Sequence, residues 1–140
     1  MAKKIILDEQ TKKFYEEKAA SLLKSYLLTG NEELRREHTI IIKYLKEAKI
    51  VNGKHPYMVY VGSKVKVLFD GDEDVEEFNV VMGSANAALS EVSIDSPVGE
   101  AILGGLAGEV VTCPVRGKDI KLRIVSCDNG QQKNDTDERQ

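Results

Sequence analysis

The sequence predicts an α+β fold, in which an N-terminal antiparallel helical hairpin precedes a twisted antiparallel sheet that carries one short helix. Apolar residues recur at steps of three and four up to Ala48, which is the period of an amphipathic helix. After Pro56 the period changes to two, the period of a half-buried strand. We therefore divide the chain into a helical hairpin at residues 1–54, an α+β domain at residues 55–127 and a disordered tail at residues 128–140.

The first helix is expected at roughly residues 9–28. Asp8 stands before it as an N-cap, because a carboxylate oxygen can accept from a free amide of the first helical turn. The apolar stripe that faces the second helix consists of Tyr15, Ala19, Leu22 and Tyr26, widened by Phe14, Leu23 and Leu27. Gly30 then ends the helix, since glycine adopts the left-handed conformation without strain.

The second helix begins after Asn31, which is a favoured N-cap residue. Glu32 and Glu33 occupy its first turn, where the helix dipole favours negative charge. Its apolar stripe consists of Leu34, His38, Ile41, Leu45 and Ala48. The short link makes the two helices antiparallel, with a length of roughly 30 Å for about 20 residues each. We interpret His38 as a packed residue of this stripe and not as a ligand.

The second part reads as alternating strands and turns around one short helix. A linker is expected from residue 51 to 56, and the predicted strands cover residues 59–69, 75–82, 91–94, 110–113 and 120–125. Ser96 and Pro97 begin a helix that runs to about Leu103, because serine caps helices and proline suits the first position. The acidic residues 70–77 lack the spacing of a calcium-binding loop, so we interpret them as a solvated turn.

Composition places the chain among soluble globular proteins. Of 140 residues 41% are hydrophobic and 31% are charged, and no apolar run approaches the ~18 residues of a membrane span. The N-terminus lacks the features of a signal peptide, so we expect a cytoplasmic protein. Residues 1–54 contain twelve Lys/Arg and eight Asp/Glu, whereas residues 55–140 contain eight and fifteen, so the two parts differ in charge.

The two cysteines, Cys113 and Cys127, are not expected to form a disulfide. They lie at the ends of a predicted hairpin whose turn falls near Arg116 and Gly117, and in that register Cys113 faces Ile120. We interpret both as small hydrophobic residues. The sequence also contains no Cys/His cluster with the spacing of a metal site.

One segment resembles a known family. Residues 96–104 read Ser-Pro-Val-Gly-Glu-Ala-Ile-Leu-Gly, and this string is similar to the signature of the C-terminal domain of the Gre transcript-cleavage factors. The similarity extends over about residues 57–127. It implies an FK506-binding-protein-like domain behind a helical hairpin, which agrees with the order of elements read from the periodicity.

The resemblance implies that RNA polymerase is the partner. In the Gre family the globular domain docks at the rim of the secondary channel, and acidic residues at the hairpin tip help to hold a second Mg²⁺ for RNA cleavage. Mg²⁺ prefers carboxylate oxygens and water, which explains the acidic tip. The residues that would contact the polymerase here are Asp95, Ser96, Pro97 and Glu100, while Ile102 and Leu103 would pack in the core.

The predicted tip departs from the family pattern. The family has Gly-Asp followed after two residues by Glu, but here Gly30 is followed by Asn31, and the later position is Leu34. Glu32 and Glu33 lie close to these positions and are the candidates for catalysis and metal binding, although we prefer to interpret them as the start of a capped helix. The hairpin is also short, as in the Rnk-type branch of the family, which lacks cleavage activity.

We expect a transcription elongation regulator that binds RNA polymerase without catalysis or a cofactor of its own, sharing at most Mg²⁺ with the polymerase. The main alternative is a cleavage-stimulating factor that uses Glu32 and Glu33. A peptidyl-prolyl isomerase is a remote alternative based on fold alone, and a plain helical dimerisation module would leave residues 96–104 without a role. We expect a monomer with no membrane partner, which meets nucleic acid only through the elongation complex.

Overall fold

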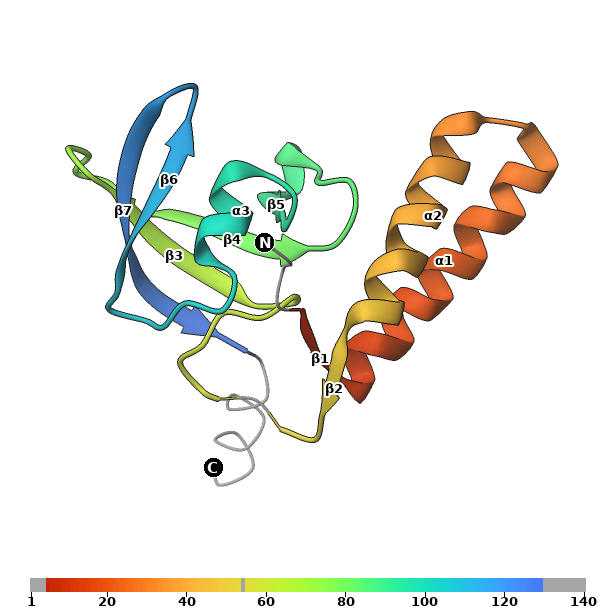
Figure 1. Ribbon diagram of the computed structural model, residues 1–140, viewed down its shortest axis with the longest axis horizontal. Helices are drawn as coiled ribbons and strands as arrows, with labels where there is room; N and C mark the ends of the chain where they lie inside the picture. Colours follow the sequence, from red (N-terminus) through yellow and green to blue (C-terminus); the bar gives the residue numbers. More distant parts are fainter. Residues whose placement is uncertain (1–4, 54, 130–140) are drawn as a thin grey trace.

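The computed structural model describes residues 5–53 and 55–129, and it confirms the predicted α+β fold class. A helical hairpin stands to one side of a curled sheet that carries a short helix (Figure 1). The elements are β1 (Ile6–Asp8), α1 (Glu9–Thr29), α2 (Glu32–Glu47), β2 (Lys49–Val51), β3 (Lys64–Phe69), β4 (Glu76–Val81), the 3-10 helix η1 (Ala87–Leu89), β5 (Glu91–Ser93), α3 (Pro97–Ile102), β6 (Val110–Val115) and β7 (Lys118–Asp128). Over these residues, no helix combines the length and the apolar character that a membrane span requires.

The base of the hairpin is closed by a small sheet that the sequence analysis missed. β1 and β2 pair in parallel, with Leu7 opposite Ile50. Val51 therefore belongs to a strand, and the predicted linker from residue 51 is wrong at its first residue. The predicted N-cap is confirmed, because Asp8 Oδ1 accepts from Thr11 N at 2.8 Å. The two strands tie the start of α1 to the end of α2, which fixes both helices at the same end.

The second sheet has the strand order β5-β4-β3-β7-β6 and is mixed. β3 pairs antiparallel with β4 and β7, and β7 pairs antiparallel with β6, as predicted. β5 pairs in parallel with β4, with Val80 opposite Val92, so the predicted antiparallel sheet is corrected at this pair. The reason is the connection: a loop and the η1 turn carry the chain back, so that β5 enters in the direction of β4.

The predicted strand at residues 59–69 is wrong in its first half. Gly62 has φ +97° and Ser63 N donates to Tyr60 O at 3.0 Å, which makes a turn before β3 begins. Val59 and Val61 are nevertheless buried. Tyr60 between them is buried as well, so burial does not alternate at residues 59–61, and the predicted strand alternation begins only with β3.

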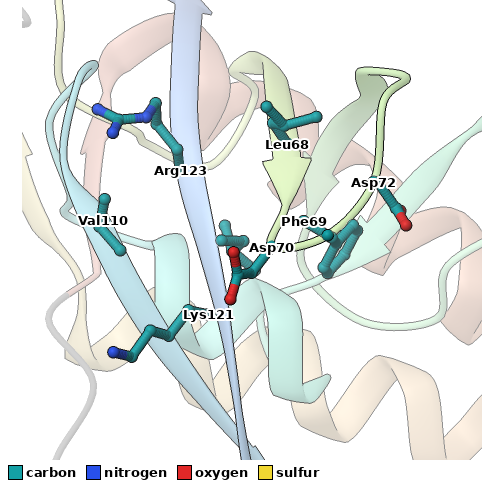
Figure 2. A pocket seen from close by; sticks show the side chains of 9 residues that line it. Leu68, Phe69, Asp70, Asp72, Val110, Lys121 and Arg123 are labelled. Atoms are coloured by element: carbon teal, nitrogen blue, oxygen red, sulfur yellow. The ribbon is translucent and has the colours of Figure 1, made fainter.

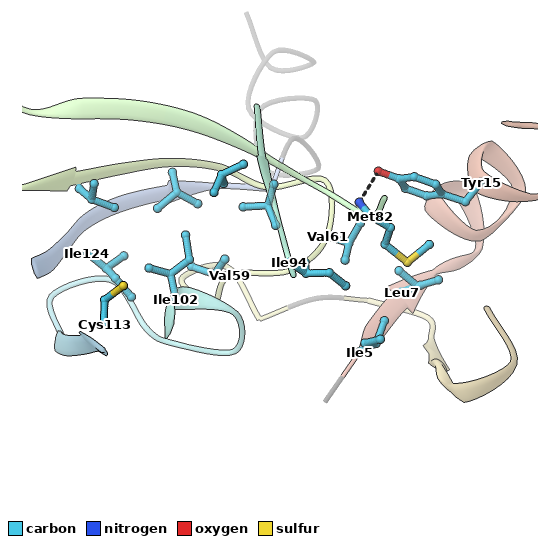
Figure 3. Close-up of a cluster of buried hydrophobic side chains, with 14 of the residues drawn as sticks. Ile5, Leu7, Tyr15, Val59, Val61, Met82, Ile94, Ile102, Cys113 and Ile124 are labelled. Carbon is cyan, nitrogen blue, oxygen red and sulfur yellow. Dashed lines mark hydrogen bonds between the residues drawn. The ribbon is translucent and has the colours of Figure 1, made fainter. Parts of the chain in front are cut away.

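One hydrophobic core joins the hairpin base to the sheet. Leu7, Tyr15 and Ile41 belong to the same buried cluster as Val61 and Met82. Figure 3 shows Leu7, Tyr15, Val61 and Met82 close together, and a hydrogen bond runs from Met82 N to the Tyr15 hydroxyl at 3.1 Å. Burial raises the pKa of Tyr15. The hairpin is therefore anchored through its base, while its tip lies at the far end from β1 and β2 (Figure 1).

The C-terminal end of the sheet corrects the predicted tail. Asp128 is the last residue of β7, and Asn129 is buried with 8% exposure. Asn129 Nδ2 donates to His55 O and Met58 O at 3.0 Å each, and the Ser63 hydroxyl donates to Asn129 Oδ1. The rest of the predicted tail, residues 130–140, lies outside the described residues.

The cysteine prediction is confirmed. Cys113 lies opposite Ile120 in the β6–β7 register, and both cysteines are free thiols. Cys113 is buried, and burial raises the pKa of its thiol. Cys127 is half-buried and its Sγ lies 3.1 Å from Met58 O.

Candidate functional site: the hairpin tip and the α3–β6 pocket

The hairpin tip is built from local backbone contacts, as the sequence predicts. Gly30 has φ +71°, and its N–H donates to Tyr26 O at 2.7 Å, which ends α1. Asn31 Oδ1 accepts from Glu33 N at 3.0 Å and so caps α2. Thr29 Oγ1 accepts from Asn31 N at 3.2 Å between the two caps. These bonds hold Glu32 and Glu33 at the first turn of α2.

Both candidate carboxylates at the tip are paired with arginines of the same helix. Glu32 Oε1 lies 2.7 Å from Arg35 Nε, and Glu33 Oε2 lies 2.7 Å from Arg36 Nη2. The hydrogen bond that Arg35 Nε donates to Glu32 raises the pKa of the Arg35 guanidinium above its ordinary value. The four charges cancel, so residues 32–36 at the start of α2 carry no net charge.

This donor set fits a magnesium ion poorly. A site for Mg²⁺ needs carboxylate oxygens that are free to coordinate the ion and its waters. Glu32 and Glu33 are exposed to solvent, but one oxygen of each is already held by a guanidinium. Within the described ranges no group of three or more His, Cys, Asp or Glu side chains could hold a metal ion.

The hairpin buries a narrower stripe than the sequence suggests. Tyr15 and Ala19 are buried as predicted, but Phe14, Leu23 and Leu27 are 58%, 38% and 71% exposed. Their predicted packing in the stripe is wrong, because α1 contacts only one neighbouring helix and the flanks of its apolar face remain open. Leu28, at 77% exposure, adds to Leu27 near the tip. The tip is thus neutral and partly apolar.

The loop and helix at residues 95–100 form the second candidate site. Ser96 Oγ accepts from Gly99 N at 3.0 Å and donates to Ser93 O at 2.8 Å, which confirms the predicted cap. Gly99 is required sterically, since a Cβ there would lie 1.8 Å from Ser93 O. Ile102 is fully buried and Leu103 half-buried, which confirms both as core residues.

α3 and β6 together enclose a shallow pocket of about 330 Å³, which we call the α3–β6 pocket. Its lining residues are Asp95, Pro97, Glu100, Ala101, Thr112 and Pro114. It therefore brings together three of the four predicted contact residues. Ser96 is the exception, because its hydroxyl is used within the helix cap. Thr112 and Pro114 were missed, since only the folded sheet places β6 beside α3.

Asp95 also contacts the hairpin. The Tyr44 hydroxyl of α2 donates a hydrogen bond to Asp95 Oδ1. Burial raises the pKa of Tyr44, and the hydrogen bond to Asp95 raises it further. No sequence signal indicates this pair, because its members are 51 residues apart.

The sequence that forms the pocket matches a known protein family. The family described as "Transcription elongation factor, GreA/GreB, C-term" matches residues 54–129, more than half of the chain. The chain belongs to the GreA/GreB family. The matched range contains the whole α3–β6 pocket and ends at the buried Asn129. The resemblance seen in residues 96–104 is thereby confirmed.

Curated GreA/GreB relatives agree with this assignment. Transcription elongation factor GreA of Acetivibrio thermocellus is 38% identical over 84 residues, covering 58% of this chain and 53% of the relative. Transcription elongation factor GreA of Clostridium perfringens is 37% identical over 100 residues, covering 68% of this chain and 63% of the relative. The matches thus span between half and two thirds of the length of these relatives.

A solved structure has the same fold. The prokaryotic transcription elongation factor GreA/GreB from Nitrosomonas europaea superposes with a TM-score of 0.51 at 21% identity, covering 89% of this chain and 99% of that chain. Because this coverage includes both parts, the hairpin-plus-sheet arrangement is that of a GreA/GreB protein. The short-hairpin branch suggested by the sequence stays a prediction.

A second hollow, lined by the end of β3, the start of β6 and the middle of β7, bears on the isomerase alternative. It has a volume of about 390 Å³, and Figure 2 shows its lining side chains. They are Leu68, Phe69, Asp70, Asp72, Val110, Lys121, Leu122 and Arg123, together with Gly71. One aromatic ring, that of Phe69, lies among charged residues of both signs. The aromatic pocket expected of a peptidyl-prolyl isomerase is therefore not present in this hollow.

Proposed function

We propose that this GreA/GreB-family chain regulates transcription elongation by binding RNA polymerase at the rim of the secondary channel, without adding catalysis of its own. The observation that carries the proposal is the pairing of Glu32 with Arg35 and of Glu33 with Arg36 at the hairpin tip. A factor of this kind occupies the channel and leaves the metal chemistry to the polymerase.

The α3–β6 pocket supplies the docking surface in this proposal. Asp95 and Glu100 give it two carboxylates, and Pro97 and Pro114 give it apolar walls. A basic side chain with apolar neighbours on the polymerase would match this lining, since opposite charges steer association and fix the register of an interface. Ser96 acts behind the surface by capping α3.

In this proposal the hairpin is the part of the chain that enters the channel. α1 has 21 residues and α2 has 16. At 1.5 Å per residue the helices are about 31 Å and 24 Å long. Leu27 and Leu28 are exposed towards the end of α1. The leading surface of the hairpin would thus offer apolar contacts and cancelled charges where a cleavage factor needs free carboxylates.

The experiment is a protection assay on backtracked elongation complexes. The purified chain is added before a cleavage-competent Gre factor, and the rate of RNA shortening is measured. We expect the wild-type chain to slow cleavage by the added factor. The double variant Pro97→Ala/Glu100→Ala should lose this protection, whereas Glu32→Gln/Glu33→Gln should retain it. Equal protection by wild type and by the pocket variant would contradict docking through α3 and β6.

Stimulation of cleavage is the second candidate, because Glu32 and Glu33 remain solvent-exposed at the tip. Stimulation of cleavage requires that Glu32 and Glu33 break their ion pairs with Arg35 and Arg36 when the metal ion of the polymerase approaches. In that case the double variant Arg35→Ala/Arg36→Ala should cleave faster than wild type. Absence of cleavage in wild type and in this variant would exclude the second candidate.

A further inference from the structure

We propose that Tyr44 is a positioning residue, which holds the hairpin at one angle to the α3–β6 pocket through the carboxylate of Asp95. That the pocket is a docking surface rests on the proposed function, but the angle between the hairpin and the pocket is a property of the free protein. The Tyr44 hydroxyl lies near the end of α2 and donates to Asp95 Oδ1. Asp95 at the same time lines the pocket.

Other contacts across the same boundary use the backbone of the globular part. The Tyr15 hydroxyl accepts from Met82 N at 3.1 Å, and Glu37 Oε2 accepts from Ser84 N at 3.4 Å. Neither Met82 nor Ser84 lines the α3–β6 pocket. Tyr44 differs from Tyr15 and Glu37 because its partner is a pocket side chain. Through this bond the hairpin contacts the pocket itself.

The packing at the hairpin base gives a reason why a directional contact is needed. Ile41 is fully buried, and it lies one turn before Tyr44 on α2. Apolar burial is non-directional, so it holds the base in place but constrains the tilt of the helices weakly. A hydrogen bond weakens steeply as its angle departs from linear. Together with the bonds at Tyr15 and Glu37, the bond from Tyr44 to Asp95 therefore narrows the tilts that the core permits, and it alone of the three ties the tilt to a side chain of the pocket.

The carboxylate of Asp95 can interact with Tyr44 and with a group in the α3–β6 pocket at the same time. An ionised carboxylate accepts at about four lone-pair positions. One oxygen can accept from Tyr44 while the carboxylate still attracts a basic group that enters the pocket. Burial and the Asp95 bond both raise the pKa of Tyr44, so the phenol keeps its proton at neutral pH and remains a donor. Occupation of the pocket and the direction of the hairpin are thereby coupled, and such coupling is reciprocal.

Pulsed electron paramagnetic resonance on the free chain tests the proposal. Nitroxide labels on p-acetylphenylalanine replace Lys24, near the tip, and Lys66, on β3, so both native cysteines remain in place. Wild type should give one narrow distance distribution. Tyr44→Phe and Asp95→Ala should each broaden it and shift its maximum, because both remove the hydrogen bond while keeping the core. Asp95→Asn should restore the narrow distribution, since an amide oxygen still accepts from Tyr44.

Tyr26→Phe is the matched control, because it removes a hydroxyl from the same hairpin near the tip. It should leave the distribution unchanged. Identical distributions for wild type, Tyr44→Phe and Asp95→Ala would overturn the proposal. Equal broadening by Asp95→Asn and Asp95→Ala would overturn it also, since charge and not the hydrogen bond would then set the angle. Urea unfolding of each labelled variant checks that it is folded.

The protection assay separates this proposal from the proposed function. If the chain docks on polymerase, Tyr44→Phe should weaken protection by about fivefold, the effect of losing one ordinary hydrogen bond. Asp95→Asn should then protect less than wild type only through its lost charge in the pocket. Absence of protection by every variant, with the distance result intact, would overturn the proposed function and leave Tyr44 as a positioning residue.

Discussion

The hairpin tip and the α3–β6 pocket are built in different ways. At the tip the caps and ion pairs join residues no more than four positions apart, as in Glu32 with Arg35 and Gly30 with Tyr26. The pocket combines α3, β6 and, through Asp95, the distant Tyr44. The tip can therefore change its chemistry without disturbing the fold, whereas the pocket cannot. We infer that docking is the constrained property of this chain and that tip chemistry is the adjustable one.

The largest effect is expected at the hairpin base, where local and distant contacts meet. Ile41→Ala should lower the free energy of unfolding by about 2–5 kcal/mol, because it empties a fully buried site shared with the sheet. Leu45→Ala, one turn further along α2, should cost clearly less, since Leu45 is only half-buried. Urea unfolding followed by circular dichroism measures both. Equal losses would show that the core does not run from Ile41 into the sheet.

The next effect tests the rigidity of the pocket. Gly99→Ala should cost about 3 kcal/mol, because its Cβ would lie 1.8 Å from the backbone oxygen of Ser93. Gly104→Ala is the matched control, since φ there is +83° but nothing lies within 4 Å. Strain alone should cost it about 1 kcal/mol. A smaller loss for Gly99→Ala than for Gly104→Ala, measured by urea unfolding, would contradict a sterically fixed α3.

Features that are formed by residues close together along the chain could be predicted from the sequence. The caps at Asp8, Gly30, Asn31 and Ser96 were all predicted and are all present, because each bond spans two to four residues. The register of Cys113 with Ile120 was predicted from a short turn for the same reason. The core stripe of α1 was overestimated at Phe14, Leu23 and Leu27, since periodicity does not show how much of a face is covered.

Contacts between distant segments could not be read from the sequence. The parallel pairing of β1 with β2 and of β5 with β4 depends on how intervening segments return. The two pocket residues contributed by β6, Thr112 and Pro114, become neighbours of Asp95 only when β6 joins the sheet. The buried position of Asn129 depends on the carbonyl groups of His55 and Met58. Asn129 is a polar residue in a polar segment, so the sequence did not indicate that it is buried.

A third prediction concerns this Asn129 anchor. Asn129→Ala removes the acceptor for the buried Ser63 hydroxyl and two hydrogen bonds to backbone carbonyls. It should lower the free energy of unfolding by about 1–3 kcal/mol, the usual cost of unsatisfied buried polar groups. Asn52→Ala, at an exposed position, is the control and should change stability by less than about 0.5 kcal/mol. Equal values in urea unfolding would show that Asn129 has no anchoring role.

The smallest effect is expected at the tip. Glu32→Gln/Glu33→Gln breaks two exposed ion pairs of α2, and exposed pairs of this kind contribute little to stability because solvent screens them. The melting temperature should therefore fall only slightly, and the difference from wild type should shrink further in high salt. Thermal unfolding at two salt concentrations measures it. A larger, salt-independent loss would show that the tip is held by more than its local contacts, which would remove the difference from the pocket.

The central proposal is that Glu32 and Glu33, each paired with an arginine, do not supply metal ligands to the polymerase, so that the chain regulates without cleaving. Incubation of purified protein with backtracked elongation complexes and magnesium, in the absence of any other factor, tests it most directly. The account predicts that the RNA keeps its length at the rate seen without protein, for wild type and for Glu32→Gln/Glu33→Gln alike. Shortened RNA that appears with wild type and disappears with the double variant would contradict it.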